Sequence, residues 1–262
     1  MPILELKHVS RHFGGLLALE DVNMIVEVGK VVGLIGPNGA GKTTMINNIS
    51  GLDHPTNGEI LFQGQAIHKQ TPHKITQIGI TRTYQNIRLF GDMTAHDNLL
   101  IGQHARGRAT LLESLFFLPR YLEEERTLRQ RATELLAQFG LEHVTNTLAG
   151  TLSYGDQRRL EMARALAANP KLILLDEPTA GMNPTETHEL GEQILRLRAM
   201  GITILVIEHD MSLIHQVCDE VYVLNFGCMI AQGTPTEIRA NPLVIEAYLG
   251  VDEDSRSPRL HT

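Results

Sequence analysis

The chain has 262 residues, enough for one large domain or for one domain with a sizeable insertion. Its formal net charge is −7, and a broad nucleic-acid surface needs a basic excess, so we expect no nucleic-acid partner. No apolar run reaches the roughly 18 residues of a membrane span, and charge begins at Glu5, so we expect no signal peptide and a protein that is soluble or held at a membrane by a partner. Two cysteines are too few for a disulfide framework, and no zinc-ligand spacing links the histidines.

The N-terminal part of the chain has the patterns of an α/β protein. Residues 22–28 place an apolar side chain at every second position, which predicts a strand. The apolar run 31–35 predicts a buried strand. A helix is expected over residues 45–50, closed by Gly51, and a turn then precedes a short strand near residues 60–62.

A glycine-rich loop lies between the buried strand and this helix. Glycine lets backbone N–H groups curl around phosphate oxygens without Cβ clashes, and the start of a helix adds its positive dipole end. Lys42 supplies a charge for the β- and γ-phosphates, and the Thr43 hydroxyl can bind Mg²⁺. The alternative is a glycine-rich turn followed by an ordinary lysine, but the spacing and both flanking elements favour a phosphate-binding P-loop. The loop comprises Gly36, Pro37, Asn38, Gly39, Ala40, Gly41, Lys42, Thr43 and Thr44.

Helical patterns replace strand patterns between about residues 89 and 152. Five apolar residues fall on one face of a predicted helix that Gly140 ends. The unusually apolar run 111–119 belongs either to the core of this helical insert or to a groove for a membrane partner. The apolar face comprises Leu128, Ala132, Leu135, Leu136 and Phe139.

Alternating strands and helices return after the insert, which implies a mostly parallel sheet with helices on both faces. One of these helices has Asn183 as its N-cap, followed by a proline and then an acid at the third position. The charged tail 252–262 contains Ser and Pro, and we expect it to be flexible. The predicted elements are helices 158–168 and 186–199, strands 172–175 and 203–207, and a closing hairpin of 221–224 and 229–231.

Two of these strands end in residues suited to catalysis. Strand 172–175 is followed by Asp176, which can hold Mg²⁺, and by Glu177, which can polarise an attacking water; the alternative is a solvated acidic turn. Strand 203–207 leads to His209, which would lie beside the γ-phosphate because ligands of open α/β sheets sit beyond the carboxyl ends of the strands. The alternative for His209 is a capping or surface histidine.

The segment 152–157 opens a helix and has two compatible interpretations. Ser153 and Asp156 are spaced as a capping box. A helix start that carries a small hydroxyl residue and a glycine, Gly155, can also bind an anion. Capping therefore does not exclude a phosphate-binding role.

The order of these segments, with Gln85 after the P-loop, resembles the ATPase subunit of an ABC transporter over about residues 4–249. In this resemblance, segment 152–157 is the signature segment of the family. The resemblance implies an α/β, P-loop NTPase (RecA-like) fold with a parallel-sheet core, an antiparallel β subdomain and an all-helical insert. The implied domains are a nucleotide-binding core of residues 1–88 and 157–250, a helical subdomain of residues 89–156 that ends in the signature segment, and a flexible tail of residues 251–262.

This resemblance also implies a site that binds ATP and Mg²⁺. Phe13 would stack on adenine, whereas its alternative is a core phenylalanine. Ser153 and Gly155 would contact the γ-phosphate of ATP bound by a second subunit in a head-to-tail dimer. The residues implied to contact the metal are Thr43, Gln85 and Asp176. The residues implied in catalysis are Glu177, His209, Lys42 and Gln85.

Departures from the usual family pattern narrow the resemblance. Tyr154 and Asp156 replace a glycine and a glutamine of the signature segment. Asn183 replaces the usual aspartate of the loop after strand 172–175, a change expected to weaken communication between the two ATP sites of the dimer. Together with segments 11–16 and 81–90, these variants resemble the LivG-type ATPase of branched-chain amino acid importers. Related ATPases for urea, short amides or aromatic acids share them, and short ATPases of lipid or polysaccharide exporters are the nearest rivals.

The expected function is ATP binding and hydrolysis that energises a membrane importer from the cytoplasmic face of the cell membrane. The expected partners are a second ATPase subunit (a copy or a paralogue), transmembrane permease subunits and, indirectly, a solute-binding protein. A non-transport ABC ATPase is disfavoured by the single P-loop, the lack of sustained heptads and the negative charge. The signature segment and His209 disfavour a P-loop kinase or GTPase.

Overall fold

The computed structural model describes residues 1–103 and 119–254, and the chain divides into two compact units. Unit 1 comprises Met1–Pro72 and Leu174–Thr262, and unit 2 comprises His73–Ile173. The helical subdomain predicted for residues 89–156 falls within unit 2, and its boundaries stay a prediction. All but the last residue of the apolar run 111–119 lies outside the described residues.

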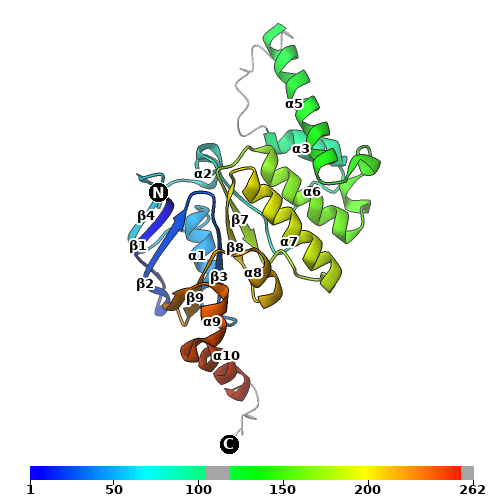
Figure 1. The fold of residues 1–262 in the computed structure, drawn as a ribbon. Helices are drawn as coiled ribbons and strands as arrows, with labels where there is room; N and C mark the ends of the chain where they lie inside the picture. Colours follow the sequence, from blue (N-terminus) through cyan, green and yellow to red (C-terminus); the bar gives the residue numbers. More distant parts are fainter. Residues whose placement is uncertain (104–118, 255–262) are drawn as a thin grey trace, which may run out of the picture. The chain divides into compact units, whose positions relative to one another are not determined.

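The N-terminal strands of unit 1 form an antiparallel sheet, as expected (Figure 1). Val22, Met24 and Val26 are buried, as the alternating pattern predicts. The prediction was wrong for Val28, which is 55% exposed, because the strand ends at Glu27 and the chain then turns through Gly29 with φ of 73°. In spatial order the strands are β2 (Leu16–Glu27), β1 (Pro2–Phe13), β4 (Asn57–Phe62) and β5 (Gln65–Ala66).

A second sheet carries the P-loop strand of unit 1. Strand β3 pairs in parallel with both β8 and β9, and β9 forms the predicted hairpin with β10. Every residue of β3, β7 and β8 is buried, which is typical of parallel strands covered on both faces. The order is β10 (Cys228–Gly233), β9 (Glu220–Asn225), β3 (Val31–Ile35), β8 (Thr203–Ile207) and β7 (Leu172–Asp176).

Two helices of unit 1, α1 and α7, lie where the sequence predicts helices, whereas α8, α9 and α10 were not predicted. Helix α1 contacts β2, and in Figure 1 it lies between the antiparallel strands and β3. Helix α7 begins at Pro184 because Asn183 caps it in a complete capping box. Helix α10 extends to Asp254, into the segment that was expected to form the tail. The helices are α1 (Lys42–Ile49), α7 (Pro184–Ala199), α8 (Met211–Val217), α9 (Pro235–Ala240) and α10 (Pro242–Asp254).

Unit 2 is mainly helical, and its helices α3, α5 and α6 pack against one another. Ala132, Leu135 and Leu136 on α5 are buried, which confirms the predicted apolar face, and Gly140 ends this region with φ of 66°. The elements are α2 (Pro72–Ile78), β6 (Ile80–Arg82), α3 (Ala95–Gln103), α5 (Pro119–Gln138), the 3₁₀ turns η2 (Glu142–Val144) and η3 (Ala149–Thr151), and α6 (Tyr154–Ala167).

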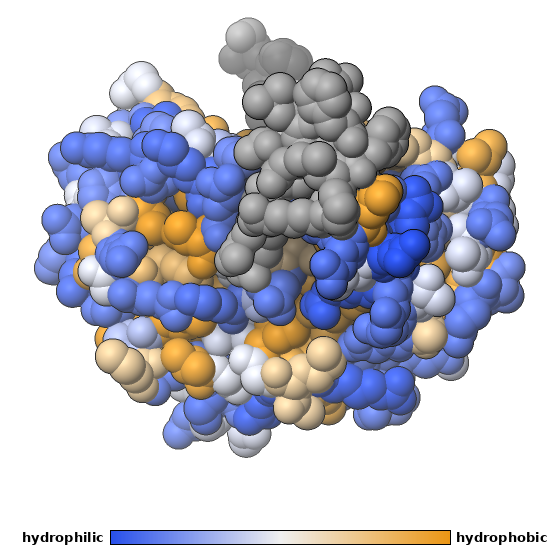
Figure 2. All heavy atoms as spheres, turned by 90° about the horizontal axis from the view of Figure 1, so that it is seen from above, coloured by the Kyte–Doolittle hydropathy of each residue, from blue (hydrophilic) through white to orange (hydrophobic). Residues whose placement is uncertain are grey.

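The surface of the protein carries both hydrophobic and hydrophilic side chains (Figure 2). Hydrophobic patches are interrupted by hydrophilic residues on the face shown in Figure 2. Within residues 1–103 and 119–254, no helix combines the length and the apolar character that crossing a bilayer requires.

Candidate functional site

The P-loop adopts a backbone that only glycine tolerates at two positions. Gly36 has φ of 151°, and a Cβ there would overlap the carbonyl oxygen of Leu224. Gly41 has φ of 105°, and a Cβ there would lie 2.6 Å from the carbonyl oxygen of Ala18. Gly41 is also the N-cap of α1 and offers no side chain to cap it. The first turn of α1 therefore presents its N–H groups as an anion site at the loop.

Lys42 is held at the centre of this loop. Its side chain is buried, and Nζ donates to the carbonyls of Gly36 at 2.6 Å and Pro37 at 3.0 Å. Burial lowers the pKa of the Lys42 ammonium, whereas the nearby Glu177 and Asp176 carboxylates raise it. The lysine is thus placed between the phosphate loop and the two acids that end β7.

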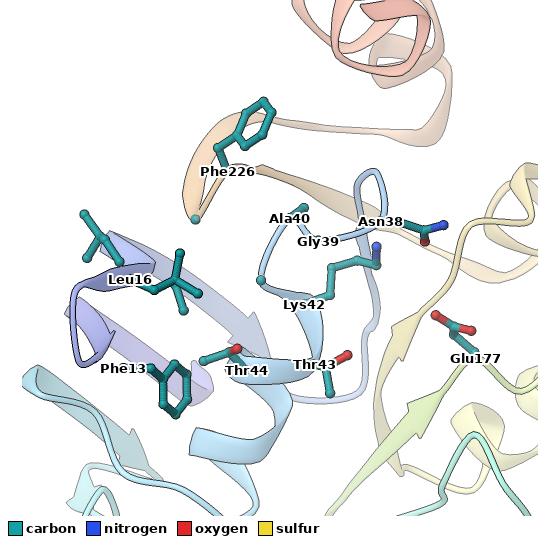
Figure 3. A pocket seen from close by; sticks show the side chains of 14 residues that line it. Phe13, Leu16, Asn38, Gly39, Ala40, Lys42, Thr43, Thr44, Glu177 and Phe226 are labelled. Carbon is teal, nitrogen blue, oxygen red and sulfur yellow. The ribbon is translucent and has the colours of Figure 1, made fainter. Parts of the chain in front are cut away.

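A pocket of about 380 Å³ opens beside the loop, which is within the range of small-ligand sites. Figure 3 shows Phe13 and Leu16 on one side of the P-loop and Glu177 on the other. Phe226 stands on the rim and is 81% exposed. The pocket is lined by Phe13, Leu16, Leu17, Ala18, Asn38, Gly39, Ala40, Gly41, Lys42, Thr43, Thr44, Glu177, Phe226 and Gly227.

Phe13 is an exposed aromatic residue at this pocket and not a core residue. Its side chain is 45% exposed. The guanidinium of Arg11 lies 4.4 Å from the ring centroid, a cation–π distance. Arg11 in turn donates two hydrogen bonds to the Asp53 carboxylate, at 2.8 and 2.7 Å. This ion pair holds Arg11 over the Phe13 ring.

The carboxyl ends of β7 and β8 bring the acids and the histidine to one edge of the unit 1 sheet. Asp176 is the buried last residue of β7. Glu177 follows with a left-handed φ of 46°, and its N–H donates to the carbonyl of Ile207 at 2.9 Å. The His209 side chain is 62% exposed. Glu177 lines the pocket, while Asp176 and His209 do not.

Three of the predicted site residues lie in unit 2. Gln85 is exposed, and Gly155 lies in the first turn of α6. Ser153 caps α6 by accepting from the N–H of Asp156 at 3.1 Å, and its hydroxyl donates to the Asp156 carboxylate at 2.7 Å. This contact differs from the expected capping box, because aspartate is one methylene shorter than the glutamate that normally reaches back to the N-cap backbone.

A buried ion pair supports the Gln85 segment. Arg158 and Glu161 are 5% and 2% exposed, and their charged groups lie 3.3 Å apart. Arg158 donates to the carbonyls of Tyr84 and Gln85. Burial raises the pKa of Glu161, and contacts that include a hydrogen bond from the Arg88 N–H oppose this rise. Sequence reasoning missed both residues, although charged residues in the buried helix 158–168 are the signal that could have found them.

The profile of the family described as "ABC transporter" matches residues 19–180, which include the P-loop, the signature segment and the Asp176–Glu177 pair. The chain belongs to the ABC transporter family. A second profile, described as "Branched-chain amino acid ATP-binding cassette transporter", matches residues 228–254 of this ABC chain.

Curated relatives of this ABC chain match over nearly the whole length of both proteins. The high-affinity branched-chain amino acid transport ATP-binding protein BraF of Pseudomonas aeruginosa is 47% identical over 250 residues, 95% of this chain and 98% of the relative. The protein LivG of Escherichia coli, with the same descriptive name, is 44% identical with the same coverage.

Solved structures of ATP-binding cassettes share this fold. One, described as the ADP conformation of an ATP-binding cassette of an ABC transporter, has a TM-score of 0.84 and 36% identity, covering 95% of this chain and 99% of the other. A nucleotide-free cassette has a TM-score of 0.82 at the same identity and coverage. As a member of this family, the chain is an ABC-type ATPase subunit.

Proposed function

We propose that this ABC ATPase energises the import of branched-chain amino acids. The observation that carries the proposal is the similarity, across 95% of this chain, to proteins named for high-affinity branched-chain amino acid transport. The profile match over residues 228–254 supports the same solute class. The pocket beside the P-loop supplies the energy-coupling site.

In this proposal the pocket holds ATP from base to phosphate. Phe13 stacks on the adenine, because it presents an exposed ring at the pocket. The N–H groups at the start of α1 and the Lys42 ammonium bind the β- and γ-phosphates. Ser153 and Gly155, at the start of α6, contact the γ-phosphate of ATP held by the second subunit.

The residues present fit a magnesium ion held jointly with phosphate. The Thr43 hydroxyl and the Asp176 carboxylate of unit 1 offer oxygen atoms, and Mg²⁺ typically binds one or two carboxylates together with phosphate oxygens. Mg²⁺ supplies charge neutralisation of the transferring phosphoryl group. The residues proposed to hold it are Thr43, Gln85 and Asp176.

Hydrolysis would use residues at the edge of the sheet. Glu177 accepts the proton of the attacking water, and Lys42 stabilises negative charge on the phosphates. His209 follows β8 and contacts the γ-phosphate with its exposed ring. Gln85 links the site to the helical subdomain of residues 89–156.

The proposed partners are a second ATPase subunit in a head-to-tail dimer, which is a paralogue or a second copy, and permease subunits in the membrane. One structural neighbour, 28% identical with a TM-score of 0.75, is described as a dimeric post-hydrolysis ATP-binding cassette, which supports a dimer. The chain would then sit peripherally on the cytoplasmic face of the membrane, with a solute-binding protein acting through the permease.

Uptake of labelled leucine tests this function. Cells that lack the gene are complemented with the wild type, Lys42→Ala or Lys30→Ala, at equal protein levels. We expect the wild type to restore uptake and Lys42→Ala to restore none, because the phosphate site loses its buried charge. Lys30→Ala is the matched control, since the Lys30 side chain is half-exposed and 3.9 Å from Asp219, and should behave as the wild type. Uptake that does not depend on the gene would remove leucine from the proposal.

A further inference from the structure

A fully buried carboxylate lies between two of the catalytic segments of unit 1. Glu208 follows β8 directly, precedes His209 and is 0% exposed. One carboxylate oxygen accepts from the N–H of Thr179 at 2.8 Å and from its hydroxyl at 2.6 Å. The other oxygen accepts from the N–H groups of His209 at 3.0 Å and Asp210 at 3.3 Å. Three of these four partners are backbone N–H groups, which can only donate, so both oxygens of the Glu208 carboxyl group act as acceptors.

The segment on one side of this carboxylate is strained. Glu177 has φ of 46°, a conformation uncommon for any residue with a Cβ. It also precedes Pro178, and a residue before proline is normally restricted to extended conformations. Such strain persists only where the surroundings over-determine the backbone. Here the Glu177 N–H is held by the Ile207 carbonyl at 2.9 Å, and Thr179 is held by Glu208.

The two oxygens of Glu208 therefore serve two different loops. One oxygen fixes the segment that begins with Glu177, and the other fixes the segment that begins with His209. We propose that Glu208 is a positioning residue that holds these two segments together and keeps Glu177 in its strained conformation. The inference rests on the proposed function, because Glu208 acts on hydrolysis only through Glu177 and His209.

The physical basis is the cost of leaving buried donors unpaired. If the carboxylate is lost, up to four donors lose an acceptor that is itself 0% exposed. The Glu177 segment can then relax toward an ordinary φ, and its carboxylate moves relative to the reacting phosphate. A displacement of about 1 Å can reduce a rate about 10²-fold. The P-loop itself does not contact Glu208 through any of these four bonds, so nucleotide binding should be spared.

The test compares Glu208→Gln, which keeps the size of the side chain, with Glu59→Gln, an exposed acid on β4 of the same unit. Hydrolysis by the full chain is measured with Mg²⁺-ATP, ATP affinity is measured separately, and amide exchange is followed without nucleotide. For Glu208→Gln we expect kcat to fall about 10- to 10²-fold, with the Kd for ATP changed less than about threefold. Because the glutamine amide keeps one acceptor oxygen, exchange should accelerate in at least one of the two segments, at Thr179 or at His209 and Asp210. Glu59→Gln should match the wild type in every measurement.

A positioning role also predicts how Glu208→Gln changes single-turnover rates when Glu177 is itself substituted. In a Glu177→Gln background, Glu208→Gln should slow hydrolysis less than it does in the wild type, because one of the two groups that it positions is already gone. Thr179→Val removes one donor only and should shift kcat and exchange in the same direction by a smaller factor. It provides the comparison if Glu208→Gln proves too unstable to assay.

Three results would overturn the inference: unchanged kcat in a folded Glu208→Gln variant, equal effects in both Glu177 backgrounds, or unchanged amide exchange in both segments. Failure of the proposed function is a different result, since the wild-type chain would then show no hydrolysis that depends on Lys42. The exchange measurement would still decide whether Glu208 joins the two segments.

Discussion

Each unit of this ABC ATPase holds a segment of the proposed site with one buried ionisable side chain, which is an acid in unit 1 and a base in unit 2. In unit 1 the Glu208 carboxylate accepts from Thr179, His209 and Asp210. In unit 2 the Arg158 guanidinium donates to the carbonyls of Tyr84 and Gln85. The difference follows the backbone, because the loops after β7 and β8 turn N–H groups inward, whereas the Gln85 segment turns carbonyls inward.

These two buried side chains, Glu208 in unit 1 and Arg158 in unit 2, are called the anchors below. They also differ in which groups surround them. Arg158 has a counter-ion, Glu161, which is itself almost fully buried and has a pKa raised by that burial. Glu208 is held chiefly by backbone N–H groups, with the His209 ring nitrogen 3.7 Å away. We therefore expect unit 2 to respond to a lost partner as a broken ion pair does, and unit 1 to respond to lost donors one at a time.

The largest expected effect comes from breaking the ion pair in unit 2. Arg158→Met should lower the free energy of unfolding by about 3–5 kcal/mol, because the buried Glu161 loses its hydrogen-bonded counter-ion and keeps only the nearby charge of Arg164. Urea unfolding followed by circular dichroism measures this loss. The matched control is Arg129→Met on α5, which removes an exposed pair with Glu125 and should cost about 1 kcal/mol or less.

The double variant Arg158→Met/Glu161→Met sharpens the comparison. Removing both charges should recover part of the stability lost in Arg158→Met, while the carbonyls of Tyr84 and Gln85, which no longer accept from Arg158, account for the remainder. A double variant that is no more stable than Arg158→Met would show that the counter-ion is not what distinguishes unit 2 from unit 1.

A smaller effect is expected when one donor of the unit 1 anchor is removed. Thr179→Val keeps the backbone N–H but deletes the hydroxyl that donates to Glu208 at 2.6 Å. Because this buried hydrogen bond leaves an oxygen of Glu208 with one partner fewer, we expect a loss of about 1–3 kcal/mol in unfolding free energy. Thr185→Val, at an exposed position on α7, should stay within about 0.5 kcal/mol of the wild type. Equal losses in the two variants would contradict the expectation that Glu208 loses stabilisation one donor at a time.

The sequence predicts the buried central strands and several of the helices, but it predicts neither the short helices α8 and α9 nor these anchors. Residues 31–35 and 203–207 are predicted as buried strands and are found as β3 and β8. A continuous apolar run of that length is typical of a strand that is buried on both faces. The P-loop is predictable for a similar reason, since its glycines are required by local backbone geometry. Val28 is the counterexample, because alternation continues in the sequence after the strand has ended.

The anchors depend on contacts between residues distant in the chain, and periodicity does not report such contacts. Glu208 and Thr179 are separated by 29 positions, and Arg158 and Gln85 by 73. The local signal for Glu208 is that an acid directly follows a fully buried strand, which equally fits a solvated strand end. Helix caps are easier to predict from the sequence, since Asn183 and its partners lie within three residues of one another.

The smallest expected effect concerns these caps, which should not distinguish the two units. Asn183 accepts from the N–H groups of Thr185 and Glu186 at 2.9 and 3.1 Å, and Ser153 caps α6 in the same manner. Asn183→Ala and Ser153→Ala should each cost about 1 kcal/mol in urea unfolding, because capping depends on local geometry and not on the sign of the buried charge nearby. Asn183→Ser should recover the loss, since serine caps as well as asparagine does. If Ser153→Ala cost several times more than Asn183→Ala, the start of α6 would owe its stability to the Arg158 network as well as to its cap, and the contrast between the two anchors would extend to the helix ends.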